Sequence, residues 1–204
     1  MSRMSAPTKR RRAATDLETS PEVRERILRT ASELFYREGA RAVGVDLVVA
    51  RAGVAKTSLY RHFGTKDDLI AAFLEREDTE FWQQWDRVAQ PHADDARAEL
   101  DALLRWVGER VARENYRGCP QLNMAAEFPD AAHPARVIAV SHVQELRRRF
   151  NAIAVRLGAD RPEQLAAQLL LLVNGAFVSS QGLAAEEAGP VLLAAARALL
   201  GETA

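Results

Sequence analysis

The 204-residue chain lacks the cysteines that a disulfide framework needs. Cys119 is its one cysteine, which excludes an intramolecular disulfide and suits a reducing compartment. Long apolar runs are also missing, because the run from Leu169 to Val173 is far shorter than a membrane span. The N-terminal segment is charged and has no apolar stretch of the kind found in secretory leaders. We therefore expect a cytoplasmic protein with no membrane partner.

Aromatic residues are scarce too, at 6% of the sequence, and no window shows alternating strand pairs bounded by hairpin turns. Alanine, leucine, glutamate and arginine recur instead, while glycine and proline cluster between periodic segments, as is typical of helical proteins. A hydrophobic content of 48% is enough for a substantial core. The sequence predicts an all-α fold.

Net charge is absent overall, with 28 basic and 28 acidic residues, but the two signs are unevenly distributed. Residues 1–66 carry 14 Lys/Arg and 7 Asp/Glu, a net charge of +7, which leaves −7 for the remainder. A basic N-terminal part can bind a polyanion, whereas an acidic remainder is repelled by one. This asymmetry favours nucleic acid as a partner of the N-terminal part.

The segment 45–66 has the pattern of a helix-turn-helix. Apolar residues recur at helical spacing over 45–49, Gly53 ends that helix where a positive φ is needed, and residues 56–63 form a second helix. The connecting turn is short, so the two helices must cross steeply. Leu59 and Phe63, four residues apart, are expected to face inward.

The polar residues of the second helix are then expected to face a DNA major groove. Short hydroxyl groups can approach base edges, while longer side chains reach phosphates and bases. Thr65 and Asp68 form a capping box, so Lys66 lies at a helix N-terminus suited to a phosphate. The predicted DNA-binding residues here are Lys56, Thr57, Ser58, Tyr60, Arg61, His62 and Lys66.

Four short segments of this region resemble the DNA-binding signature of TetR-type transcriptional regulators: Ala52-Gly53-Val54, Leu59-Tyr60, His62-Phe63 and Lys66-Asp67-Asp68-Leu69. The resemblance covers roughly Pro21 to Phe73 and is far more specific than a bare helix-turn-helix. It implies a dimeric, all-helical regulator with an N-terminal three-helix DNA-binding domain and a larger C-terminal helical domain for ligand binding and dimerisation. It further implies that a small effector releases the protein from its operator.

These patterns divide the chain into three parts. Residues 1–19 are polar and include Arg10, Arg11 and Arg12, so we expect a disordered basic arm that either lies along DNA or serves as a solvated tail. Residues 20–66 form the DNA-binding domain, and residues 67–204 form the effector-binding and dimerisation domain. A long helix from Thr65 to about Gln90 is expected to link the two and to transmit a change in one to the other.

Polar residues within the apolar helices of the C-terminal part are candidates for a ligand pocket, although each one alone is more often a satisfied core group. Aromatic residues at helical spacing have the same two interpretations. The predicted effector-binding residues are Trp106, Cys119, Asn123, Glu127, His142, Asn174 and Phe177, with Gln181 beside them.

The C-terminal helices are candidates for a dimer interface. Leu169 to Val173 leaves no polar face at 100° per residue, so that helix has to be covered on all sides. With an apolar final helix at 191–200, this predicts a four-helix bundle across a two-fold axis, which suits a palindromic operator. The predicted interface residues are Leu169, Leu172, Val173, Ala176, Leu192 and Leu199.

The main hypothesis is a homodimeric repressor of transcription that binds double-stranded DNA and needs no cofactor, metal or catalytic residue. The spacing of Cys119, His133 and His142 matches no zinc motif. Three alternatives stay open: a regulator that senses electrophiles or oxidants through Cys119, a helical enzyme that uses Cys119 with a histidine, and a helical adaptor that only dimerises.

Overall fold

The computed structural model describes residues 20–179 and 182–201, and over these residues the chain is helical with no strand, which confirms the all-α prediction. None of the helices in these ranges combines the length and the apolar character needed to cross a membrane. Arg10, Arg11, Arg12 and Gln181 lie outside the described residues. The elements are α2 (Pro21–Glu38), α3 (Val45–Ala52), α4 (Lys56–His62), α5 (Lys66–Ala89), the 3-10 turn η1 (Gln90–His92), α6 (Ala96–Val111), α7 (Pro120–Glu127), α8 (Pro134–Arg156), α9 (Pro162–Val178) and α10 (Ala185–Leu199).

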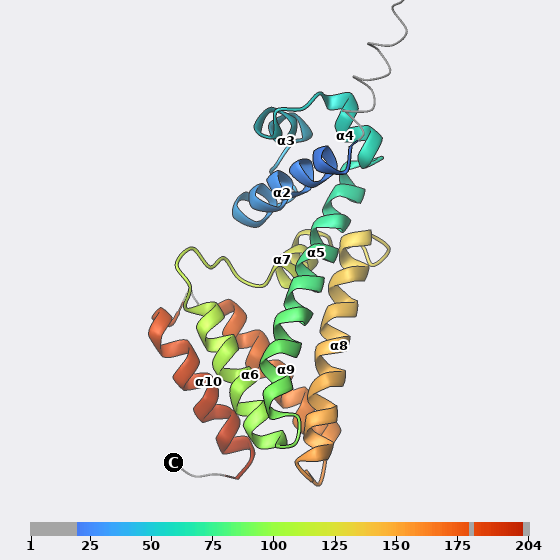
Figure 1. Ribbon diagram of the computed structural model, residues 1–204. Coiled ribbons are helices and arrows are strands. Elements are labelled where there is room, and N and C mark those ends of the chain that lie inside the picture. The colour runs from blue at the N-terminus through green and yellow to red at the C-terminus, as the bar shows by residue number, and fades with distance from the viewer. Residues whose placement is uncertain (1–19, 180–181, 202–204) are drawn as a thin grey trace, which may run out of the picture. The chain divides into compact units, whose positions relative to one another are not determined.

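The chain forms two compact units, which we call the head, ending at Phe73, and the body, starting at Leu74. Helix α5 contributes residues to both units and matches the long helix expected from Thr65 to about Gln90 (Figure 1). The two units divide after Phe73, inside α5, rather than after residue 66 where we expect the domain boundary.

The head is assembled from short-range signals. Ser20 caps α2 by accepting a hydrogen bond from the Val23 N–H at 3.3 Å. Gly53 ends α3 with φ +63°, the left-handed conformation that the sequence required. At the start of α5, Thr65 and Asp68 exchange two hydrogen bonds of 2.9 and 3.0 Å, which confirms the capping box.

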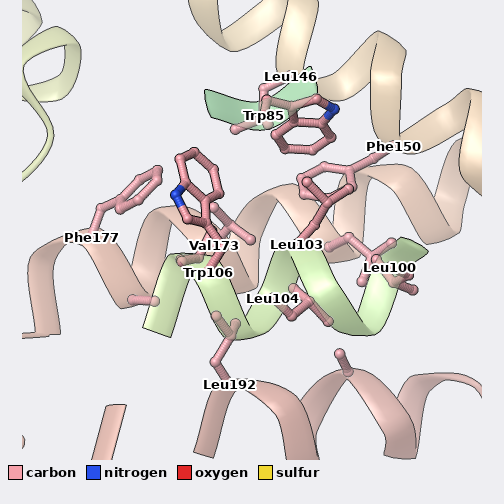
Figure 2. Close-up of a cluster of buried hydrophobic side chains, with 14 of the residues drawn as sticks. Trp85, Leu100, Leu103, Leu104, Trp106, Leu146, Phe150, Val173, Phe177 and Leu192 are labelled. Atoms are coloured by element: carbon pink, nitrogen blue, oxygen red, sulfur yellow. The ribbon is translucent and has the colours of Figure 1, made fainter. Parts of the chain in front are cut away.

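The body is a helical bundle around an aromatic and aliphatic core. Helix α9 packs against α6, α8 and α10, while α10 also packs against α6 (Figure 1). Figure 2 shows Trp85, Trp106, Phe150 and Phe177 pointing toward one another from α5, α6, α8 and α9. The core therefore draws large side chains from helices that are far apart in the sequence.

Most of the apolar residues on α9 face this core. Leu169 and Val173 are 0% exposed and Leu192 on α10 is 3% exposed, while Ala176 is also buried. We predicted that these residues form a dimer interface. That prediction is wrong, because they are already buried within one subunit, where α9 packs against α6, α8 and α10. Leu171 at 72% and Leu199 at 38% remain exposed, with Leu172 half-buried.

Helix α10 starts earlier than the apolar pattern indicated. It begins at Ala185, before Pro190, which lies inside the helix. The Glu187 carboxylate accepts a hydrogen bond from the Ala184 N–H at 2.9 Å and so stabilises this earlier start. The expected start at residue 191 is corrected accordingly.

Candidate functional site

The outer face of α4 carries the candidate DNA-contacting residues of the head. Thr57 and Arg61 are exposed and Tyr60 is 43% exposed. Because residues three and four apart lie on one side of a helix, these three side chains share a face. Leu59 and Phe63 are buried, as predicted. The outward orientation of this face is confirmed, and its contacts with DNA stay a prediction.

Ser58 does not belong to that face. We expected it to project outward, but it is 1% exposed, and this expectation is wrong. Helix α4 packs against both α2 and α3, so its buried side is wider than the Leu59–Phe63 spacing indicates. His62 is half-buried at the edge of the same side, with its ring centroid 6.5 Å from that of Phe63.

Two lysines flank the α4 face. Lys56 Nζ lies 2.7 Å from Asp46 Oδ1 on α3, and this hydrogen bond raises the pKa of Lys56. Both side chains are largely exposed, so water screens the pair and a phosphate can compete for the ammonium group. Lys66 is the first residue of α5, and its Nζ lies 3.5 Å from the Arg41 carbonyl oxygen.

A second candidate site lies inside the body, where α5 meets α8. Asp78 Oδ1 accepts a hydrogen bond from Trp82 Nε1 at 3.0 Å and lies 2.6 Å from His142 Nδ1. An ionised carboxylate can only accept, so His142 Nδ1 carries a proton. Burial by itself lowers the pKa of His142, but its hydrogen bond to Asp78 and the neighbouring Cys119 thiol raise it to about 9.

Two buried polar atoms at this place have no hydrogen-bond partner: His142 Nε2 and Gln121 Oε1. Gln121 is 2% exposed and donates through Nε2 to the Leu74 carbonyl oxygen at 3.3 Å, which turns Oε1 away from that carbonyl. Leu74 and Asp78 are one turn apart on α5, about 6 Å along the helix axis. Gln121 and His142 are therefore attached to α5 at neighbouring positions.

Aromatic rings surround this polar spot. The Phe81 ring centroid lies 4.8 Å from that of His142, 5.1 Å from Trp106 and 6.4 Å from Phe177. The Trp82 ring is 5.1 Å from His142. The structure thus brings Trp106, His142 and Phe177 together, with the Cys119 thiol beside His142.

The remaining predicted pocket residues are placed differently. Asn123 donates through Nδ2 to the Arg117 carbonyl oxygen at 2.8 Å, so it holds the loop before α7 rather than pointing into the aromatic cluster. That corrects our expectation for Asn123. Glu127 and Asn174 are half-buried on α7 and α9, and their part in a ligand site stays a prediction.

Sequence reasoning missed Asp78 and Gln121. Asp78 and Trp82 are four apart on a helix, so their contact was within reach of a local pattern. Gln121 carries no such signal, because its partner Leu74 is 47 positions away. The position of Phe81 and Trp82 beside His142 follows from packing between helices.

Nothing in this cluster indicates metal chemistry. Among residues 20–179 and 182–201, no three His, Cys, Asp or Glu side chains are arranged to hold a metal ion. Cys119 is 4% exposed, so a reagent in water has little access to its thiol. This burial does not favour a role as an electrophile or oxidant sensor.

Comparison with known proteins decides the family. The family model for bacterial regulatory proteins of the tetR family matches residues 27–73. The crystal structure of SCO4454, a TetR-family transcriptional regulator from Streptomyces coelicolor, is similar with 30% identity and a TM-score of 0.84, over 90% of this chain and 97% of that one. The chain belongs to the TetR family.

Among curated TetR-family relatives, the transcriptional repressor Rv3405c of Mycobacterium tuberculosis is 28% identical over 72% of this chain and 79% of its own length. The transcriptional activator FasR of Mycolicibacterium smegmatis is 46% identical, but over 27% of this chain and 25% of its own. These relatives regulate transcription and are not enzymes. This TetR-family protein is accordingly a DNA-binding transcriptional regulator rather than a Cys/His enzyme.

Proposed function

We propose that this TetR-family protein is a homodimeric repressor that binds a palindromic operator and leaves it when a small molecule enters the body. The observation that carries the proposal is the exposed polar face of Thr57, Tyr60 and Arg61 on α4. Each head presents one such face to DNA. Lys56 and Lys66 flank it and are proposed to hold phosphates, and Arg10, Arg11 and Arg12 are proposed to extend this contact.

Pairing of two copies is supported by an apolar strip on α9 and α10. Leu171, Gly175 and Val178 are spaced four and three apart on α9, and Leu171 and Val178 are 72% and 55% exposed. On α10, Val191 is 52% exposed, and an apolar groove lies between the two helices. Exposed apolar area of this kind favours burial against a second copy. This strip replaces Leu169, Val173 and Leu192 as the proposed interface, with Leu172 and Leu199 kept beside it.

Two copies related by a two-fold axis present two α4 helices. A symmetric pair reads two half-sites of opposite orientation, which is why a palindromic operator is proposed. Repression, rather than activation, is supported by the name of Rv3405c, whose match covers more of this chain than that of FasR.

Release by an effector is supported by helix α5, which contributes residues to both units. Its residues Asp78, Phe81 and Trp82 line the polar and aromatic cluster of the body. A ligand that prefers the conformation without DNA by about 1–3 kcal/mol weakens operator binding about 5- to 150-fold. Trp106, Cys119, His142 and Phe177 are the proposed wall of that ligand site.

The test begins with selection of DNA from a random-sequence library by the purified full chain. We expect an inverted repeat, with one dimer bound per repeat in sedimentation measurements. Leu171→Glu should give monomers and weaken binding to the selected DNA by at least about a hundredfold, because the two half-sites no longer act together. A reporter gene carrying the selected site should be repressed, and an increase in its expression would show activation instead.

Selection of DNA without symmetry would contradict the palindrome. A Leu171→Glu variant that stays dimeric would contradict the proposed interface while leaving DNA binding by the head intact. Arg61→Ala separates these cases, because it should abolish sequence preference without changing the oligomeric state.

A further inference from the structure

In the head, the first turn of α2 lies against the C-terminal end of α4 (Figure 1). The guanidinium carbon of Arg24 is 4.9 Å from the centroid of the Phe63 ring. Phe63 is the C-cap residue of α4 and is 3% exposed, whereas Arg24 is exposed. Arg24 therefore covers a buried ring at the point where the DNA-facing helix ends.

The apolar side of α2 leads to this position. Leu28, Ala31 and Phe35 are buried and are spaced three and four residues apart. Arg24 comes four residues before Leu28, so it lies one turn closer to the N-terminus on the same side of the helix. An apolar side chain is sufficient to cover a ring. The arginine at this place adds a charge and five N–H donors that such a covering role does not use.

The contact with Phe63 leaves the hydrogen-bonding capacity of Arg24 unspent. A cation–π contact is an electrostatic attraction to the ring and supplies no lone pair to the N–H groups. Within residues 20–179 and 182–201, Arg24 donates no hydrogen bond and forms no ion pair. Its guanidinium is thus held in place by a ring and is still able to bind an oxyanion, which reduces the loss of side-chain entropy on binding.

We propose that Arg24 binds a backbone phosphate of DNA beside the C-terminal end of α4. This inference rests on the proposed function, because it adds a contact to the DNA-binding surface of the head. A planar guanidinium can donate two parallel hydrogen bonds to two phosphate oxygens, which fixes an orientation as well as a distance.

The position of Arg24 fits a helix that enters the major groove. Such a helix has a sugar–phosphate strand on either side of the groove. Lys56 is the first residue of α4 and Phe63 follows its last residue, so Lys56 and Arg24 place one cation near each end of the helix. Gly64, next to Phe63, is exposed and has no side chain, so a DNA strand can approach the backbone there.

Arg26 provides a matched control. It is exposed and lies two positions after Arg24 on α2, about 200° around the helix, so it projects from another side. Arg26→Gln and Arg24→Gln remove the same charge from the same helix. A difference in DNA binding between these two variants therefore cannot come from net charge.

The first test measures the affinity of the full chain for selected and random DNA by fluorescence anisotropy over a salt titration. Arg24→Gln should weaken both by about tenfold at low salt and reduce the slope of log affinity against log salt by about 1 for each bound head. The ratio of the two affinities should stay unchanged, because a phosphate contact carries no sequence information. Arg26→Gln should stay within about twofold of wild type. Equal effects of the two variants would overturn the proposal.

The second test separates a phosphate contact from a purely structural role. Arg24→Met can still cover the Phe63 ring but has no N–H donor, and Arg24→Lys keeps the charge without the planar donor pair. We expect Arg24→Met to unfold at the wild-type temperature and to bind DNA as weakly as Arg24→Gln, while Arg24→Lys recovers the wild-type salt slope. Wild-type DNA affinity of Arg24→Met would show that covering the ring is the whole role of this residue.

The third test locates the phosphate. Each backbone phosphate of the selected DNA is replaced in turn by an uncharged methylphosphonate. One position in each half-site should weaken binding of wild type and of Lys66→Ala, yet have no effect on Arg24→Gln, because the contact is already lost in that variant. A scan without such a position would contradict the inference and leave the regulator intact. If no DNA sequence is selected, the proposed function fails, while the affinities and salt slopes on random DNA still test Arg24.

Discussion

The head and the body use polar side chains in opposite ways. In the head, Thr57, Tyr60 and Arg61 lie on the outside of one short helix, and their positions follow from consecutive sequence. In the body, His142 and Gln121 are buried and are held by residues 64 and 47 positions away. The polar surface of the head is formed by the seven consecutive residues of α4, whereas the polar cluster of the body depends on the packing of several helices.

The same contrast appears when one ion pair from each region is compared. The side chains of Lys56 and Asp46 are 52% and 81% exposed, so salt and competing phosphates control their pairing. The side chain of His142 is 2% exposed, so its pairing with Asp78 responds to pH much more than to salt. Changes in the head should therefore alter DNA binding, and changes in the body should alter stability and ligand response.

The largest expected effect is a loss of stability from Gly108→Ala, which should leave DNA sequence preference unchanged. A Cβ atom at Gly108 would lie 2.5 Å from the Gly189 Cα, so α6 and α10 have to move apart. We expect a loss of about 1–3 kcal/mol in the free energy of unfolding, measured by urea denaturation.

Gly189→Ala is the graded control for this prediction. A Cβ atom there would meet the Gly108 Cα at 3.2 Å, so a smaller shift suffices and a smaller loss is expected. Equal losses in the two variants, or none in Gly108→Ala, would mean that the crossing of α6 and α10 is looser than the structure indicates.

The next effect is in the head. Lys66→Ala should weaken binding to selected and random DNA alike, by about tenfold at low salt, and should reduce the slope of log affinity against log salt by about 1. Thr57→Ala is its matched comparison, because it should change sequence preference and leave the salt slope unchanged. Both are measured by fluorescence anisotropy over a salt titration. Wild-type affinity of Lys66→Ala across that titration would remove Lys66 from the phosphate contacts.

The fold of the head was predictable because its signals are local. Gly53, the capping box of Thr65 and Asp68, and the spacing of Leu59 and Phe63 each depend on at most four residues. Ser58 was misplaced because its burial depends on packing against α2 and α3, which the sequence of α4 does not contain.

The positions of the body's helices were predictable from the sequence, but the packing of these helices against one another was not. Its helices followed from periodicity, yet Leu169 and Val173 were assigned to a partner subunit because the sequence does not reveal that α6, α8 and α10 cover them. The pairing of Asp78 with His142 was missed for the same reason. The sequence predicts a pocket with a few polar groups, whereas the contacts of Asp78, Gln121 and His142 follow only from the packing of α5, α7 and α8.

The body's buried pair gives a prediction in pH. Because the folded-state pKa of His142 is raised to about 9 from 6.5, its stabilising contribution is complete below about pH 6.5 and is lost as the pH rises through about 9. The free energy of unfolding of wild type should fall between about pH 6 and about pH 9.5, and Asp78→Asn should reduce that fall. The same pH dependence with and without the Asp78 carboxylate would show that this pair does not set it.

The smallest expected effect comes from the exposed ion pair between Lys56 and Asp46 in the head. Asp46→Asn removes the carboxylate that pairs with Lys56, so the ammonium becomes free for a phosphate and one negative charge leaves the DNA-facing side. We expect affinity for random DNA to rise about two- to fivefold at low salt, with a steeper salt slope and no change in unfolding free energy beyond about 0.5 kcal/mol. In a Lys56→Gln background the gain should shrink, because the freed ammonium is no longer present. Weaker DNA binding by Asp46→Asn would mean the reverse, that the carboxylate positions Lys56 for the phosphate rather than competing with it.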